Sequence, residues 1–258
     1  MAQNQKSSSP IMAICGKGGA GKTVLCALLA RALLDRGVRP LLLIDADPAG
    51  GLCGAVGEQP ENTLAGAREN LIKSARNAGE QEKQQLADQL DYMVHQALLE
   101  RPGYALLAMG RSRDAGCFCP ANTLLRQAID AVSHPFAVVL IDAEAGLEQI
   151  ARRVTRSVTL VIAVSDGSQR SLDTMAQMHA MIGETPMAAV FNHTAENEVY
   201  PLPPGVGLLG CVPHDEQVRD YDRAAQRLWQ LPEGNPARAA ASAIAQRLIE
   251  KMKMSVIS

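Results

Sequence analysis

The sequence contains few aromatic residues, and this shortage limits how its core can be built. Aromatic side chains make up 3% of the 258 residues, whereas hydrophobic residues as a group make up 47%. The core must therefore consist mainly of Leu, Ile, Val, Ala and Met side chains, a composition that favours parallel strands covered by helices. A chain of this length is compatible with one large α/β domain.

The sequence also lacks a strong charge imbalance and a long hydrophobic run. It has 25 basic and 27 acidic residues, a formal charge of -2, which gives no electrostatic reason to expect a nucleic-acid surface. Residues 1–10 are polar, and no hydrophobic stretch follows that could act as a signal sequence or span a bilayer. We therefore expect a cytoplasmic protein without stable membrane insertion, with a disordered tail over 1–9 and a single domain over 10–258.

Short hydrophobic runs alternate with helical patterns along the chain. This alternation predicts an α/β fold with a doubly wound, mostly parallel sheet of seven to eight strands. The runs interpreted as buried strands are Ile11–Cys15, Leu41–Asp45, Tyr104–Met109, Phe136–Asp142, Val158–Val164, Met187–Phe191 and Val206–Cys211.

Between these runs, hydrophobic residues recur three and four positions apart, as in an amphipathic helix. The clearest cases are Thr23–Arg36, Thr123–Val132 and Leu172–Ile182. Residues 61–101 form one long, charged and Gln-rich excursion, which we predict to make two helices separated near Gly79.

A phosphate-loop motif follows the first predicted strand. Residues 16–23 read Gly-Lys-Gly-Gly-Ala-Gly-Lys-Thr, and a strand before and a helix after the motif are the context that it requires. The glycines let backbone N–H groups and a helix N-terminus face the phosphates, while Lys22 reaches the outer phosphates and Thr23 binds Mg²⁺. The motif predicts a site for ATP or ADP formed by Gly16, Lys17, Gly18, Gly19, Ala20, Gly21, Lys22, Thr23 and Val24.

The loop carries a second lysine, Lys17, directly after its first glycine. In this respect it resembles the deviant phosphate loop of the superfamily that includes MinD, ParA, the nitrogenase iron protein and arsenite ATPase, P-loop NTPases of the MinD or SIMIBI type. The resemblance implies that Lys17 contacts the phosphates across a dimer interface and stabilises charge on the transferring phosphoryl group as an arginine finger does elsewhere. Lys22 is the other lysine that we count as catalytic. A solvated loop lysine is the alternative. On the first interpretation the protein is an ATP-dependent homodimer.

Two acidic residues close the second predicted strand, and one closes the fourth. Asp45 and Asp47 lie at the carboxyl end of the sheet, where ligands bind in such folds. The superfamily resemblance implies that this is switch I, in which Asp47 positions or activates the attacking water and Asp45 helps to hold the Mg²⁺ shell. Asp142 follows four hydrophobic residues, as in a Walker B motif, and should hold Mg²⁺ through water.

Gly146 follows Asp142 in a stretch that we interpret as switch II. Its backbone N–H can approach the γ-phosphate, so this segment should change conformation when the phosphate is lost. For either acidic segment taken alone, capping of the following helix is the alternative.

Asn192 and Pro213 follow the sixth and seventh predicted strands, at places that match where the superfamily reads adenine. An amide can donate and accept hydrogen bonds at the same time, which suits a base edge. We therefore assign Asn192 to the base and the Pro213 region to backbone contacts with it. An ordinary turn role for Asn192 is the alternative.

Cys117 and Cys119 are separated by one residue after the third predicted strand. This spacing is too tight for a relaxed disulfide, but it can present two thiolates to one metal ion. A closed Zn²⁺ site or a square-planar Ni²⁺ site needs about four ligands, so two chains related by a C2 axis would complete it. Two core cysteines on a loop are the alternative. The remaining cysteines, which we interpret as packing residues, are Cys15, Cys26, Cys53 and Cys211.

With these features together, the chain resembles the CooC family, the nickel-dependent maturation ATPases of carbon monoxide dehydrogenase. The similarity covers nearly the whole chain, and its C-x-C and D-x-E-A-G motifs are specific to that family and its acetyl-CoA synthase relatives. The resemblance is carried by Met109-Gly110-Arg111, Gly116-Cys117-Phe118-Cys119, Asn122 with Leu124-Leu125-Arg126, and Asp142-Ala143-Glu144-Ala145-Gly146.

The resemblance implies an ATP-driven dimeric metallochaperone. Such a protein holds one Ni²⁺ ion per dimer, or Zn²⁺ in vitro, at its cysteines and assists nickel insertion into an Fe–S enzyme. Ala49-Gly50-Gly51 replaces an Asn-rich turn of the family, and Gln149 stands where a His often occurs. These departures leave the identity of the target enzyme open.

Two other functions are compatible with parts of the sequence. A MinD- or ParA-like positioning ATPase could use the predicted end helix Ala237–Met254 on a membrane, although its hydrophobic stripe is also what packing on a sheet requires. An electron-transfer ATPase like the nitrogenase iron protein would bridge an Fe–S cluster between subunits, but it takes its cysteines from two separated loops. In this sequence they are adjacent.

Overall fold

The structure, a computed structural model, describes six segments of the chain: 9–76, 92–111, 128–129, 132–143, 158–194 and 199–255, with only the backbone described for 71–76 and 254–255. Ser9 is the first described residue, and its hydroxyl donates a hydrogen bond to the backbone carbonyl of Ser133 at 2.9 Å. The predictions for 1–8, for Gly79 and for most of the helix at 123–132 lie outside the described residues, as do those for the site residues Cys117, Cys119 and Gly146.

The eight strands in the described residues form one sheet, in the order β3-β4-β2-β5-β1-β6-β7-β8. All neighbouring pairs are parallel except β3 and β4, so the predicted doubly wound, mostly parallel sheet is confirmed. The strands are β1 Ile11–Gly16, β2 Leu41–Asp45, β3 Leu98–Arg101, β4 Tyr104–Ala108, β5 Val138–Asp142, β6 Leu160–Ser165, β7 Met187–Asn192 and β8 Gly207–Val212.

The antiparallel edge strand β3 was not predicted. It lies in the last four residues of the charged excursion, where the sequence indicated helix, and the structure indeed has α3, Leu64–Arg76, and a helical stretch at 92–97 before it. Gly103, with φ at 88°, allows the tight connection from β3 to β4. Two leucines followed by Glu100 and Arg101 are too short a run to identify a strand before its partner is known.

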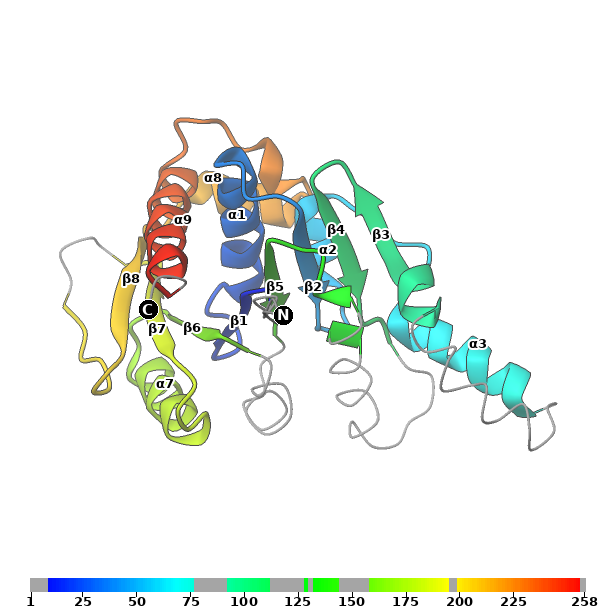
Figure 1. Cartoon of the computed structure of the whole chain (residues 1–258). Helices are drawn as coiled ribbons and strands as arrows, with labels where there is room; N and C mark the ends of the chain where they lie inside the picture. Colours follow the sequence, from blue (N-terminus) through cyan, green and yellow to red (C-terminus); the bar gives the residue numbers. More distant parts are fainter. Residues whose placement is uncertain are drawn as a thin grey trace, which may run out of the picture.

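Helices cover both faces of the sheet (Figure 1). One face packs against α1 Lys22–Asp35, α2 Gly51–Val56, α8 Glu216–Arg223, the 3-10 turn η1 Leu228–Gln230 and α9 Pro236–Ser255. The other packs against α3 and α7, Gln169–Met181. Side chains alternate along β1, since Met12 and Ile14 face α1 whereas Ile11, Ala13 and Cys15 face the opposite layer. Both faces are therefore hydrophobic, as the composition requires.

The strand order places β1 at the point where the winding of the chain reverses. After β1 the chain builds the side of the sheet that holds β2 and β4, and after β5 it builds the side that holds β6, β7 and β8. Ligands of doubly wound sheets bind at such a switch point, beyond the carboxyl ends of the strands. The phosphate loop follows β1 directly and therefore lies there. Among the described helices, none is long and hydrophobic enough to cross a membrane.

Candidate nucleotide site

The phosphate loop leaves β1 at Gly16 and enters α1 at Lys22. A side chain at Gly16 would overlap the carbonyl oxygen of Val164 on β6, so only glycine lets these strands approach so closely. Gly19 and Gly21 have φ values of 81° and 86°, in the left-handed region that favours glycine. Lys22 curls back over the loop, and its amine lies 3.4 Å from the carbonyl oxygen of Lys17. This weak contact leaves the amine available to phosphate oxygens.

Asn192 connects the end of β7 to this loop. Its side-chain amide donates to the carbonyl of Ala20 at 2.9 Å, and the residue is 3% exposed. A Cβ atom on Gly21 would overlap the Nδ2 atom of Asn192. The structure thus brings Ala20, Gly21 and Asn192 together at the edge of the loop.

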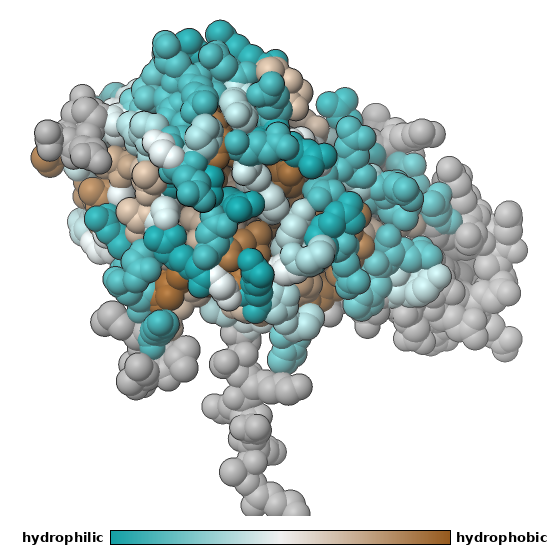
Figure 2. All heavy atoms as spheres, turned by 90° about the horizontal axis from the view of Figure 1, so that it is seen from above, coloured by the Kyte–Doolittle hydropathy of each residue, from teal (hydrophilic) through white to brown (hydrophobic). Residues whose placement is uncertain are grey.

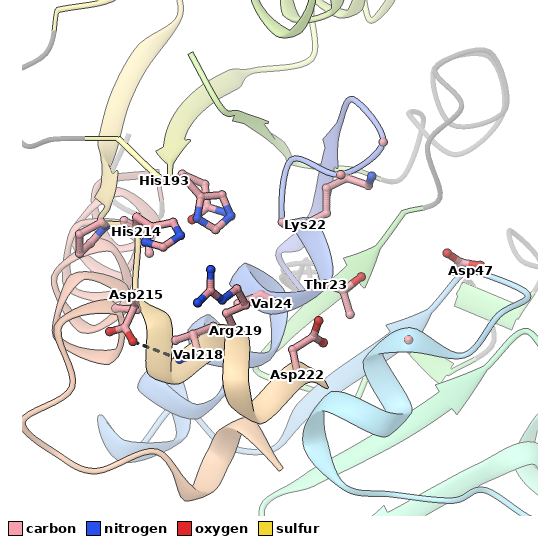
Figure 3. Close-up of a pocket in the computed structure, with 18 residues that line it drawn as sticks. Lys22, Thr23, Val24, Asp47, His193, His214, Asp215, Val218, Arg219 and Asp222 are labelled. Atoms are coloured by element: carbon pink, nitrogen blue, oxygen red, sulfur yellow. Dashed lines mark hydrogen bonds between the residues drawn. The ribbon is translucent and has the colours of Figure 1, made fainter. Parts of the chain in front are cut away.

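A cavity of about 720 Å³ opens beside the loop (Figure 3). Its walls come from the loop and the start of α1, the turn after β2, the ends of β7 and β8, and helix α8. This volume suits a small-molecule or cofactor ligand. The predicted site residues that line the cavity are Gly18, Gly19, Gly21, Lys22, Thr23, Val24, Asp47, Asn192 and Pro213.

Asp142 is buried beside Thr23, at 1% exposure. The Thr23 hydroxyl donates to Oδ2 of Asp142 at 2.7 Å, whereas Oδ1 has no hydrogen-bond partner in the part of the chain that the structure describes. Burial raises the pKa of Asp142 to about 7, against the lowering effect of the Thr23 hydrogen bond. A buried carboxylate oxygen that lacks a partner, beside a threonine hydroxyl, fits a water-mediated Mg²⁺ site.

Asp45 pairs in register with Asp142 on the neighbouring strand, but its carboxylate is engaged elsewhere. One oxygen accepts from the backbone N–H of Cys53 at 2.9 Å, and the other accepts from that of Asp47 at 3.3 Å. Asp45 is fully buried, and burial raises its pKa. In this structure the carboxylate holds the turn that leads into α2. Its predicted place in the Mg²⁺ shell stays a prediction.

Asp47 lines the cavity, whereas Lys17 does not. Asp47 is at the rim of the cavity (Figure 3), where its Oδ1 atom accepts from the backbone N–H of Ala49 at 2.7 Å. The amine of Lys17 lies 3.7 Å from Oδ2 of Asp166, just after β6, and Lys17 does not line the cavity. Both side chains of this ion pair are about one third exposed, so Lys17 can reach another molecule.

Further cavity residues were not assigned from the sequence. His193 and His214 directly follow the assigned Asn192 and Pro213, and Arg219 and Asp222 lie on α8. A capping signal could have revealed α8, because Asp215 accepts from the N–H of Val218 at 3.0 Å and Glu216 occupies the first turn. The direction in which α8 points its side chains depends on packing that no local pattern records.

The described cysteines behave as packing residues. Cys15, Cys26 and Cys53 are buried, and Cys211 is half-buried. Burial raises the pKa of Cys15 to about 12, which disfavours its reactive thiolate form. Over the described ranges, no group of three or more His, Cys, Asp or Glu residues is placed to hold a metal ion.

This geometry defines a P-loop nucleotide-binding protein with a MinD-like fold. A family model described as an AAA domain matches residues 9–193, and the chain belongs to this family. It is 33% identical over 251 residues to an uncharacterized ATP-binding protein of Methanocaldococcus jannaschii, a match covering 93% of this chain and 99% of the relative.

Another relative is the carbon monoxide dehydrogenase accessory protein CooC of Rhodospirillum rubrum. It is 31% identical over 259 residues, covering 93% of this chain and 97% of the relative. Among solved structures, MinD of Pyrococcus furiosus matches with a TM-score of 0.66 and 22% identity, over 95% of this chain and 99% of that one. MinD of Pyrococcus horikoshii, complexed with Mg-ADP, matches with a TM-score of 0.67 and 20% identity, over 95% of this chain and 98% of that one. These structures support the fold alone.

Proposed function

We propose that this protein is an ATP-hydrolysing, dimeric metallochaperone that assists nickel insertion into carbon monoxide dehydrogenase or the related acetyl-CoA synthase. The observation that carries the proposal is the combination of a nucleotide site with the pair Cys117 and Cys119, in a chain 31% identical to CooC over 93% of its length. We place the activity in the cytoplasm.

The nucleotide is ATP, with its phosphates held by the loop N–H groups and Lys22. Thr23 and Asp142 hold Mg²⁺, which the partnerless Oδ1 atom of Asp142 supports. When bound, this ion neutralises charge on the β- and γ-phosphates. Asp47, fixed at the cavity rim by the N–H of Ala49, orients the attacking water, and Gly146 contacts the γ-phosphate by its backbone N–H.

Dimerisation completes the active site in this proposal. Lys17 does not line the cavity of its own chain, and its amine lies 3.7 Å from Oδ2 of Asp166 in an ion pair that is about one third exposed. In the dimer the amine leaves this exposed pair and enters the site of the second chain, where it stabilises charge on the transferring phosphoryl group.

Nickel is the cargo of the dimer. Two thiolates from each chain, Cys117 and Cys119, give the four ligands that one Ni²⁺ or Zn²⁺ ion requires. ATP and metal then act on the same assembly, because both sites depend on two chains meeting.

The positioning function has less support. The hydrophobic stripe of α9 includes Ile244 and Leu248, which are 1% and 0% exposed and pack against the sheet. This stripe is therefore not available to a membrane. Figure 2 shows one face of the molecule, on which hydrophilic residues cover most of the surface and hydrophobic ones appear in small separate areas.

The proposal is tested by anaerobic titration of the full chain with Ni²⁺, without nucleotide and with ADP or ATP. We expect one ion per two chains, and loss of the ion in Cys117→Ser and in Cys119→Ser while ATP still binds. Cys211→Ser, at a half-buried packing position, is the matched control and should keep the ion. A brown, iron-containing dimer, or metal binding that both variants retain, would overturn the proposal.

A further inference from the structure

Arg219 is a cavity residue that pairs, among the described residues, with an exposed carboxylate on its own helix. It lies on α8, and its guanidinium extends into the cavity toward His193 (Figure 3). It donates to Oε1 of Glu216 at 3.3 Å, but the Glu216 side chain is 77% exposed. Exposed pairs of this kind contribute little to stability, so the guanidinium can exchange this partner for a ligand.

His193 lines the same cavity as Arg219 and has an uncommon backbone conformation. Its φ is 63°, in the left-handed region that non-glycine residues seldom occupy, and its N–H donates to the carbonyl of Val212 at 2.9 Å. Such conformations persist where the surrounding structure holds them, often at ligand sites. Burial, and then the neighbouring His214, lower the pKa of His193, which favours the neutral form of the imidazole.

We propose that His193 and Arg219 clamp the two faces of the nucleotide base, which lies with its edge on Asn192. This inference rests on the proposed nucleotide site and deepens it, since Asn192 and the Pro213 region account for the edge of the base but not for its faces. A neutral imidazole stacks on one face of a purine, and the planar guanidinium stacks on the other.

The neighbouring His214 does not supply the second face. The rings of His193 and His214 have their centroids 5.6 Å apart and are tilted by 51°. A base stacked between two groups needs about 3.5 Å on each side, or about 7 Å in total. The pair of histidines is therefore too close to admit a base, whereas Arg219 approaches from a different element, α8.

The clamp and Asn192 have separate roles. Stacking acts on any base, because every base has a π-face. The Asn192 amide offers one acceptor and one donor, which match the amino group and ring nitrogen at one edge of adenine but not the two acceptors of guanine. Arg219 should therefore contribute affinity without base preference, and Asn192 should contribute preference for adenine.

The test is equilibrium binding of ATP, GTP and ribose 5′-triphosphate, which lacks the base, to the full chain. We expect Arg219→Ala to weaken ATP and GTP binding by the same factor, about 3- to 30-fold, and to leave ribose triphosphate binding unchanged. His193→Asn removes the ring at a residue type that tolerates positive φ, and it should show the same pattern. Arg223→Ala is the matched control, because Arg223 is exposed on the same helix and does not line the cavity.

The outcomes separate this proposal from the function on which it rests. Equal weakening of ATP and ribose triphosphate in Arg219→Ala would place the guanidinium on phosphate or ribose and overturn the clamp. ATP binding that matches the wild type and Arg223→Ala would also overturn it while leaving the nucleotide site intact. A wild-type chain that fails to bind ATP would overturn the proposed function itself.

Discussion

Two glycines of the phosphate loop, Gly19 and Gly21, differ in how much space surrounds them. Gly19 and Gly21 both have positive φ values, but they differ in their surroundings. A Cβ atom on Gly19 meets nothing within 4 Å, whereas one on Gly21 would overlap Nδ2 of Asn192. Backbone strain from alanine is shared by the two positions, and the collision with Asn192 is specific to Gly21.

We therefore predict that Gly21→Ala is more damaging than Gly19→Ala. The collision breaks the buried hydrogen bond from Asn192 to Ala20, so the free energy of unfolding should fall by about 1 to 3 kcal/mol more in Gly21→Ala. ATP affinity should also fall further, because Asn192 is displaced from the base. Urea denaturation and equilibrium ATP binding on both variants measure these differences, and equal losses in the two would refute the explanation.

At the scale of elements, one side chain joins the starts of α8 and α9. The carboxylate of Asp215 caps α8 by accepting from the backbone N–H of Val218. The side-chain Oδ1 atom of Asn235 caps α9 by accepting from the backbone N–H of Arg238 at 2.9 Å. The Asn235 amide then donates to the second carboxylate oxygen of Asp215 at 2.8 Å. This bridge sets α8, and with it Arg219, relative to the helix that packs on α1 and β8.

Loss of the bridge should destabilise the protein. Asn235 is 3% exposed, so Asn235→Ala removes a helix cap and leaves the partly buried Oδ2 atom of Asp215 with one partner fewer, at a cost of about 2 kcal/mol of unfolding free energy. Asn235→Ser keeps a capping oxygen and should lose less. Urea denaturation measures the unfolding free energy of each variant. Asn62→Ala, at an exposed asparagine, is the control, and its unfolding free energy should change little. If Asn235→Ser lost as much as Asn235→Ala, capping of α9 would not be the cause.

At the scale of the whole molecule, a polar network joins the antiparallel edge of the sheet to α1. The Glu58 carboxylate accepts from the Arg101 guanidinium at 3.0 and 2.8 Å and from the Tyr104 hydroxyl at 2.7 Å. The Tyr104 ring packs edge-on against Trp229 at 5.0 Å, and the Trp229 indole donates to the carbonyl of Ala27 at 2.8 Å. Glu58, in the segment that follows α2, therefore connects residues from β3, β4, η1 and α1 through this network of contacts.

The charge of Glu58 makes this contribution depend on pH. Burial acts to raise the pKa of Glu58, but the hydrogen bonds from Arg101 and Tyr104 outweigh it and leave the pKa below its ordinary value of 4.5. A depressed folded-state pKa stabilises the protein above the unfolded-state pKa, and this stabilisation is lost as the pH falls through the folded-state value. The urea midpoint of Glu58→Gln should thus lie below that of the wild type by a constant amount from about pH 8 to 5, and the gap should shrink below about 4.5.

Glu61→Gln is the matched control for this measurement, since Glu61 is exposed on the same segment. Its midpoint should follow the wild type at every pH. A gap between Glu58→Gln and the wild type that persists unchanged into acid would show that the ionised carboxylate is not what stabilises the network.

The features that depend on local patterns can be predicted from the amino-acid sequence alone. The glycine spacing of residues 16–23 identified the phosphate loop, because the backbone path around a phosphate needs glycine at set positions. Seven of the eight strands were predicted, since each buried parallel strand is a continuous hydrophobic run. Asp142 was identified in the same way, as an acid that closes such a run.

Contacts between polar groups that are distant in the sequence depend on how the sheet and helices pack. β3 was missed because its pairing with β4, and not its composition, makes it a strand. The Asp45 carboxylate accepts a hydrogen bond from the backbone N–H of Cys53 in α2. The Asn192 side chain donates to the carbonyl of Ala20, 172 residues away in the chain. His193 and Arg219 line one cavity because the end of β7 and one side of α8 both form its walls. Partners so far apart in sequence leave no periodic signal, so only the packed sheet brings them together.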